Sequence, residues 1–141
     1  MELEALGTFT VTLATDRIHA VGDGPAGNRV VFEVDSGEFT GDRLVARTKG
    51  GACADWSITD GRGTVTLDVR AVLETDDGAL IYVTYGGRAD FSKGPGSAPL
   101  YGSMTFETGN DDYRWLNTVV AAIKGSFSDS RTIAYEVARL T

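Results

Sequence analysis

The sequence is poor in the residues that build metal centres, disulfides and cofactor sites. Its 141 residues include one histidine and one cysteine, His19 and Cys53, so no disulfide can form within the chain. A zinc site needs three or four Cys, His or carboxylate ligands, and neither residue has a partner at metal-ligand spacing. Residues 22–27 match G-x-G-x-x-G, but Pro25 interrupts the pattern and a strand-like run follows, which indicates a turn and not a dinucleotide loop. We expect neither a metal nor a cofactor.

Positive charge and long apolar runs are scarce as well. The chain has 13 Lys and Arg against 20 Asp and Glu, a net charge of −7, whereas nucleic-acid binding needs clustered basic residues. No apolar run approaches the roughly 18 residues of a membrane-spanning helix. The acidic start of the chain lacks the basic-then-apolar order of a signal peptide. These absences favour a cytoplasmic protein that binds neither nucleic acid nor membrane.

Glycine is abundant, with 18 residues, while proline is rare, with three. The glycines separate short runs rich in β-branched and aromatic residues, which is typical of an all-β chain with glycine turns. About nine or ten strands are predicted, over residues 6–14, 29–34, 38–40, 43–48, 54–58, 63–75, 79–85, 100–108, 119–127 and 132–140. The length fits one domain that spans residues 1–141.

Two local signals refine this prediction. Asp77-Gly78 lies between two strong strand patterns, and Asp-Gly is a preferred pair for a type I′ hairpin turn. One short helical turn is predicted over Asp111–Asn117, since an aspartate can cap the first backbone N–H groups. So many consecutive strands leave exposed edges unless the sheet closes or stacks. We therefore predict a single closed or nearly closed antiparallel β-barrel with one short helical turn.

The strand predicted over residues 63–75 has one apolar and one polar face. The polar face carries Asp68, Arg70 and Glu74. If this face lines the barrel, the lumen is partly polar and Arg70 can hold a carboxylate, enolate or phenolate oxygen. The alternative is an outer face with cross-strand ion pairs. A barrel of about eight strands has room for side chains or one small ligand.

Aromatic and polar residues gather at two further places. Trp56 follows Asp55, and Trp115 lies two residues before Asn117. The tryptophans either plug the ends of the barrel or form the walls of a pocket in which Asp55 or Asn117 handles a proton or donates a hydrogen bond. Lys124 interrupts an apolar run, where it either reaches water or lies buried as a base.

Four segments, in this order along the chain, resemble the DUF3237 (UPF0311) family. They are Gly37-x-Phe39-x-Gly41-x-Arg43-Leu44; Gly50-Gly51 with Ala54-Asp55-Trp56; Arg70-x-x-Leu73-x-Thr75-x-Asp77-Gly78-x-x-Ile81-Tyr82-Val83; and Phe106-Glu107-Thr108-Gly109-x-x-x-Tyr113-x-Trp115-Leu116-Asn117. The chain departs from the family pattern at Ala52-Cys53, which are inserted after the glycine pair. The resemblance covers nearly the whole chain and implies a small barrel, similar in shape to allene oxide cyclase-like and dirigent-like barrels.

For function, the resemblance implies cofactor-free chemistry of lyase, decarboxylase, isomerase or cyclase type on a small, partly aromatic substrate. The residues that match the family motifs suggest a division of roles. Arg70 with Tyr82 would hold developing negative oxygen, and Asp55 or Glu107 would shuttle a proton. The residues expected to contact the substrate are Trp56, Trp115, Asn117 and Lys124.

Two functions of other classes also fit the sequence, because a fold alone does not fix function. The first is a non-catalytic barrel that carries or senses a hydrophobic small molecule. The second is an assembly subunit whose polar face is simply solvated. A homo-oligomer is compatible with each of the three.

Overall fold

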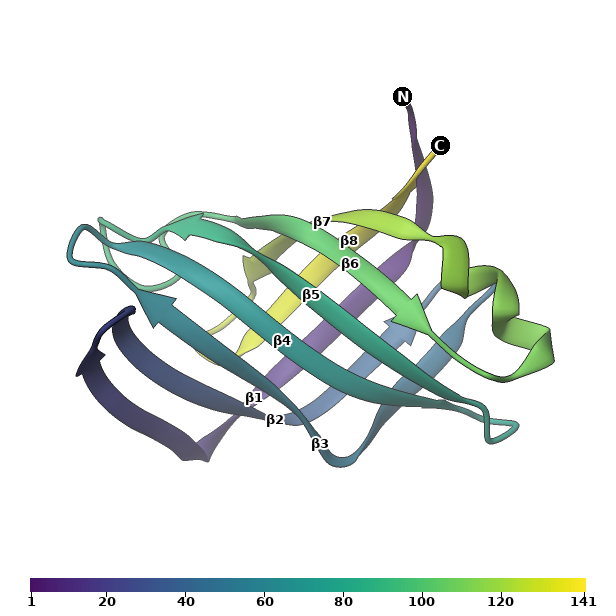
Figure 1. Ribbon diagram of the computed structural model, residues 1–141, viewed down its shortest axis with the longest axis horizontal. Coiled ribbons are helices and arrows are strands. Elements are labelled where there is room, and N and C mark those ends of the chain that lie inside the picture. The colour runs from purple at the N-terminus through teal and green to yellow at the C-terminus, as the bar shows by residue number, and fades with distance from the viewer.

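The computed structural model describes residues 1–141, and eight antiparallel strands close into one barrel (Figure 1). The strands are β1 (Leu3–Gly24), β2 (Gly27–Thr40), β3 (Val45–Thr59), β4 (Thr64–Thr75), β5 (Leu80–Asp90), β6 (Leu100–Glu107), β7 (Val120–Phe127) and β8 (Thr132–Leu140). Each strand pairs with the next in sequence, and β8 pairs with β1. A short 3-10 helix, η1 (Asp111–Thr118), joins β6 to β7. The predicted barrel with one short helical turn is confirmed.

The strands are fewer and longer than predicted because bulges join segments that look separate in the sequence. Residues 29–34 and 38–40 belong to β2, whose register with β3 shifts between Glu33 and Glu38. Residues 43–48 and 54–58 belong to β3, whose register with β4 shifts between Thr48 and Cys53. The inserted Ala52-Cys53 pair lies at the end of this second irregular stretch, and a bulge of this kind can absorb extra residues without ending the strand.

The β4–β5 hairpin forms where Asp77-Gly78 predicts it, but with a different turn. Only Gly78 has a positive φ, of 87°, and no aspartate of the turn does. The Gly78 N–H donates to the Thr75 carbonyl oxygen at 3.0 Å. This geometry fits a type I turn followed by a glycine in the left-handed region, whereas a type I′ turn requires positive φ at both central residues.

The apolar face of β4 points into the barrel, and its polar face points out to solvent. Leu67, Val69 and Leu73 are buried inside the barrel, while Asp68 and Arg70 are exposed on the outside. Of the two alternatives for the polar face, the structure shows the outer one, and the interpretation in which Arg70 lines the lumen is wrong. The physical reason is that alternate apolar side chains gain by burial, whereas an unpaired guanidinium is costly to bury.

Side chains fill the barrel at the end that carries η1. The rings of Phe9, Phe39 and Phe106 follow one another with centroids 6.2 Å apart, and Leu116 of η1 is fully buried. Tyr85 continues the series, with its ring 6.0 Å from that of Phe9. This aromatic core closes one end of the barrel, so space for a ligand is left only towards the other end.

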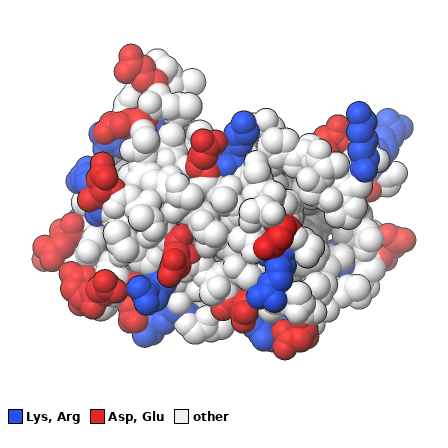
Figure 2. All heavy atoms as spheres, turned by 180° about the vertical axis from the view of Figure 1, so that it is seen from behind, with Lys and Arg blue, Asp and Glu red and all other residues white.

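Charges on the outer surface are mixed in sign. On the face seen in Figure 2, acidic and basic side chains are interspersed and the middle of the face is mostly uncharged. Exposed ion pairs join neighbouring strands, such as Lys49 with Glu74 and Arg139 with Glu4, each at 2.7 Å. No helix in the structure has the length and apolarity that a membrane span requires.

Candidate functional site

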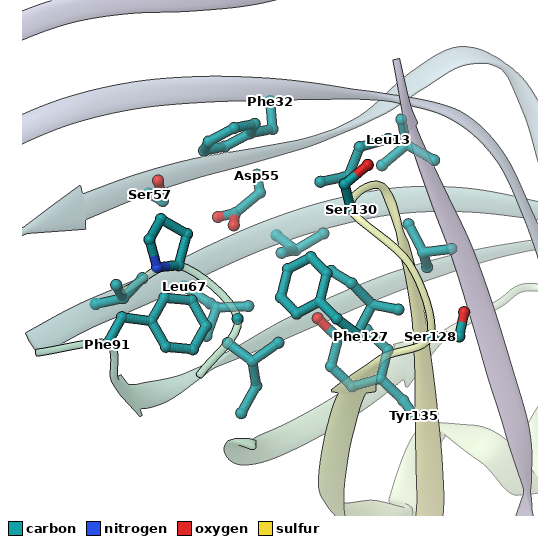
Figure 3. Close-up of a pocket in the computed structure, with 18 of the residues that line it drawn as sticks. Leu13, Phe32, Asp55, Ser57, Leu67, Phe91, Phe127, Ser128, Ser130 and Tyr135 are labelled. Atoms are coloured by element: carbon teal, nitrogen blue, oxygen red, sulfur yellow. The ribbon is translucent and has the colours of Figure 1, made fainter. Parts of the chain in front are cut away.

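A cavity of about 620 Å³ occupies the end of the barrel away from η1 (Figure 3). Its lining is largely apolar, with 13 hydrophobic residues among 21. The loops β5–β6 and β7–β8 contribute the rim, through residues 95–96 and 128–130. Volume and lining are those of a pocket for a small organic ligand, which is mostly apolar with a few placed polar groups.

Asp55 is the carboxylate within the apolar part of this cavity. It lies on β3, opposite Phe32 of β2 and Val69 of β4, and Figure 3 shows its side chain among the lining residues. Its Oδ1 accepts a hydrogen bond from the Asp68 backbone N–H at 3.0 Å. One oxygen is thereby tied to β4, and the carboxylate has a fixed position from which to meet a ligand.

The hydrogen bond from the Asp68 N–H to Asp55 forms where the pairing of β3 with β4 is interrupted. Trp56 and Ser57 have no register partner on β4. The Trp56 carbonyl instead accepts a hydrogen bond from the Arg29 guanidinium at 2.6 Å. The Asp68 N–H is therefore free to donate to the Asp55 carboxylate. Arg29 thus helps to position Asp55 without lining the cavity.

The environment raises the pKa of Asp55 from 3.8 to about 6. Burial is the main cause, and the nearby Asp68 carboxylate adds to it. The hydrogen bond from the Asp68 N–H and the charge of Arg29 act in the opposite direction. A carboxyl group whose pKa lies near neutrality can both accept and return a proton, which suits it to general acid–base chemistry.

Two tyrosines that the sequence analysis did not select also line the cavity. Tyr85 of β5 and Tyr135 of β8 pack edge to face, with ring centroids 5.2 Å apart. Burial raises the pKa of both phenols, so they stay protonated and can donate hydrogen bonds. Strand parity could have identified them, because Tyr85 alternates in phase with the apolar Val83 and Tyr135 with Ile133.

Phenylalanines supply the aromatic walls that were expected from the tryptophans. Phe32, Phe91 and Phe127 line the cavity (Figure 3), and the last two pack edge to face at 6.2 Å. Neither Trp56 nor Trp115 is among the lining residues. Of the eight candidates chosen from the sequence, only Asp55 faces the cavity.

Three of the other candidates meet on the outside of the barrel. Trp56, Arg70 and Tyr82 line a shallow outer groove of about 430 Å³, where the Arg70 Cζ lies 4.4 Å from the centre of the Trp56 ring. Glu107 is exposed on β6, in register with Tyr82. The sequence suggested that Arg70 and Tyr82 line the lumen, and this is wrong. Both side chains lie on the outward-facing side of their strands.

The remaining candidates lie away from both places. Trp115 on η1 packs under Arg43, whose Cζ is 3.7 Å from the ring centre. The Asn117 side chain accepts from the Thr108 N–H at 2.8 Å and donates to the Thr108 carbonyl at 2.9 Å. This pair of bonds fixes the chain where it leaves β6. Lys124 is exposed on β7.

The structure offers no arrangement suited to a metal ion or a thiolate nucleophile. No group of three or more His, Cys, Asp or Glu side chains lies close enough together to hold a metal. Burial, followed by the charge of Asp55, raises the pKa of the Cys53 thiol to about 12, so the thiol is protonated at neutral pH.

The family model described as "Protein of unknown function (DUF3237)" matches residues 1–140 of the chain. The chain belongs to the DUF3237 family. A curated relative, a UPF0311 protein from Rhodopseudomonas palustris (strain TIE-1), is 25% identical over 126 residues, which cover 81% of this chain and 82% of the relative. The resemblance inferred from the sequence motifs is thereby confirmed.

Several solved structures share the fold of this DUF3237 chain. A beta-barrel like protein from Acinetobacter baumannii AYE is 32% identical, with a TM-score of 0.85 over 99% of this chain and 96% of that one. A protein of unknown function from Clostridium acetobutylicum is 21% identical, with a TM-score of 0.86 over 100% of both chains. A structure from Penicillium herquei, described as an enzyme, is 22% identical, with a TM-score of 0.71 over 99% and 94%. The last two likenesses concern the fold alone.

Proposed function

We propose that this barrel is a cofactor-independent acid–base catalyst, of lyase, isomerase or cyclase type, acting on a small, partly aromatic substrate in its cavity. The observation that carries the proposal is a half-buried carboxyl group, Asp55, with a pKa of about 6 in the wall of an apolar cavity. Structural carboxylates are seldom placed this way, whereas catalytic ones often are. The Penicillium herquei neighbour described as an enzyme adds a barrel of similar shape with catalytic activity.

The lining residues suggest a division of roles. Ionised Asp55 removes a proton from a carbon next to a substrate carbonyl, and the protonated carboxyl group later returns it. Tyr85 and Tyr135, which remain protonated, donate hydrogen bonds to the enolate oxygen that develops in between. The phenylalanine walls hold an aromatic body and exclude water. Isomerisation, cyclisation and elimination can all begin with this enolisation.

The test is proton exchange in a model ketone, because exchange reports enolisation whatever reaction follows. The wild-type protein in deuterated buffer is expected to accelerate exchange at the benzylic carbon of 2-tetralone, as followed by proton NMR. The rate is expected to rise with pH through about 6, as Asp55 ionises. Asp55→Asn is expected to slow the protein-dependent exchange about 100-fold, the size of a typical general-base contribution.

Glu136→Gln is the matched control. It makes the same carboxylate-to-amide change beside Tyr135, but on the exposed face of β8, and is expected to leave exchange unchanged. Equal exchange rates for the wild type and Asp55→Asn would contradict the proposal. Binding of 2-tetralone without any exchange above the buffer rate would contradict it too, and would favour the non-catalytic carrier or sensor.

A further inference from the structure

The cavity contains anionic and neutral polar groups but no cation. None of its 21 lining residues is Lys, Arg or His. Its ionisable lining groups are Asp55, Asp129, Tyr85 and Tyr135. At the rim, the hydrogen bond from the Arg131 backbone N–H is the main reason that the pKa of Asp129 is lowered, so this carboxylate is negatively charged at neutral pH. The cavity is thus negatively charged at its mouth, through Asp129, and at its wall, through Asp55.

Three cations on segments that also contribute lining residues, or on the strand beside Asp55, are paired elsewhere or lie outside the cavity. Arg29 donates to the Trp56 carbonyl. Arg131 forms an ion pair with Asp35 at 3.5 Å. Lys93 is exposed on the β5–β6 loop and is not a lining residue. A negatively charged group that entered the cavity would therefore find no positive partner among these side chains.

Asp55 makes an anion still less favourable. On β2, Asp55 is opposite Phe32, and the charge of Arg29 on the same strand lowers its pKa. On β4, Asp55 is opposite Val69 and accepts a hydrogen bond from the Asp68 N–H. Across the lumen the charge of Asp55 raises the pKa of Tyr135 and Tyr85, and on its own strand it raises that of Cys53. An unpaired buried charge costs several kcal/mol, and a second charge of the same sign nearby adds to that cost.

We propose that the cavity selects an aromatic ligand that carries a hydroxyl or carbonyl group and no negative charge, and that it rejects carboxylates and phosphates. Neutral polar groups have partners here: Asp55 accepts a hydrogen bond from a ligand hydroxyl, and the two tyrosines donate to a ligand oxygen. This inference names the ligand class for the proposed function. It rests on that proposal because it takes the same cavity as the active site. It removes decarboxylation from the reactions the site can perform, because that substrate is a carboxylate.

Two probes with one naphthalene body and different charge test the inference. They are 2-naphthol, which is neutral at about pH 7.5, and 2-naphthoate, which is an anion. Isothermal titration calorimetry of the wild-type protein is expected to show 2-naphthol binding about tenfold or more tightly than 2-naphthoate. In Asp55→Asn the preference for 2-naphthol over 2-naphthoate is expected to narrow about fivefold, because the repelling carboxylate is gone. Glu136→Gln is expected to keep the wild-type ratio.

Equal or tighter binding of 2-naphthoate by the wild type would overturn the inference. The inference would also be overturned if Asp55→Asn kept the wild-type preference for 2-naphthol over 2-naphthoate, because the rejection of the anion would then not depend on Asp55. These ratios are measured without turnover, so they are separable from the catalytic proposal. A protein that prefers 2-naphthol but does not exchange 2-tetralone retains the ligand class and loses the catalysis. If the protein exchanges 2-tetralone but prefers 2-naphthoate, the catalytic proposal is retained and the ligand class is wrong.

Discussion

Asp55→Asn is expected to become more stable relative to the wild-type protein as the pH rises. The pKa of Asp55 is about 6 in the folded protein, against an ordinary value of 3.8. A carboxyl group with a raised pKa stabilises the fold while it is protonated, and this stability is lost as the pH rises through the folded-state pKa. The difference between the two pKa values corresponds to about 3 kcal/mol. Asparagine does not ionise, and its side-chain oxygen can still accept from the Asp68 N–H.

Urea denaturation at two pH values measures this effect. The free energy of unfolding of Asp55→Asn, relative to wild type, is expected to increase by about 2 kcal/mol between about pH 4 and about pH 7.5, because part of the loss lies below that range. Effects of the substitution that do not depend on pH cancel in this comparison. Glu136→Gln is expected to show no such trend. If the unfolding free energy of Asp55→Asn minus that of the wild type stays constant with pH, Asp55 titrates as an ordinary exposed aspartate; if this difference decreases with rising pH, folding lowers its pKa. Either result would contradict the prediction.

Gly102→Ala is expected to destabilise the barrel by about 3 kcal/mol, at the upper end of overpacking costs. Gly102 on β6 faces Gly87 on β5. A Cβ added at Gly102 would overlap the carbonyl oxygen of Gly86 and lie 2.9 Å from the Cα of Gly87. These neighbours are backbone atoms, so no side-chain rotation relieves the overlap and the two strands must move apart. The expected result is a lower urea midpoint.

Gly109→Ala is the matched control for this substitution. A Cβ at Gly109 would meet nothing within 4 Å, and its φ is not in the positive range. Its free energy of unfolding is expected to stay within about 1 kcal/mol of wild type, the range of the unfolded-chain effect of replacing glycine. If Gly102→Ala unfolds at the wild-type urea midpoint, the close β5–β6 approach is not a feature of the folded protein.

The fold was largely predictable because its signals are local. Alternation along residues 63–75, the Asp77-Gly78 turn and the helical segment that begins at Asp111 all act over a few residues, and edge protection then favours closure. The residue that caps this segment is Asn110 and not an aspartate. The number of strands was less accessible. Short strands on either side of Glu33–Glu38 and Thr48–Cys53 are one strand each, because a bulge continues a strand through residues that lack its pattern.

The site was only partly predictable, because strand parity says which residues share a face but not which face is inside. The polar face with Arg70 seemed suited to a lumen, yet the apolar face of β4 occupies it. Asp55 could be selected from its place beside Trp56 and from the family resemblance, but its inward direction depends on the register after the β3 bulge. Tyr85 and Tyr135 were missed because each looks like one more core residue of its strand. Their proximity across the barrel, at 5.2 Å, is a property of closure.

The central claim is that the barrel cavity beside Asp55, and not the outer groove at Trp56 and Arg70, is the functional site. A crystal structure of the wild-type protein soaked with 2-naphthol tests it most directly. We expect ring density between Phe32, Phe127 and Tyr135, with the ligand oxygen within hydrogen-bond distance of Asp55. Density stacked on Trp56 in the outer groove, with an empty barrel, would contradict it.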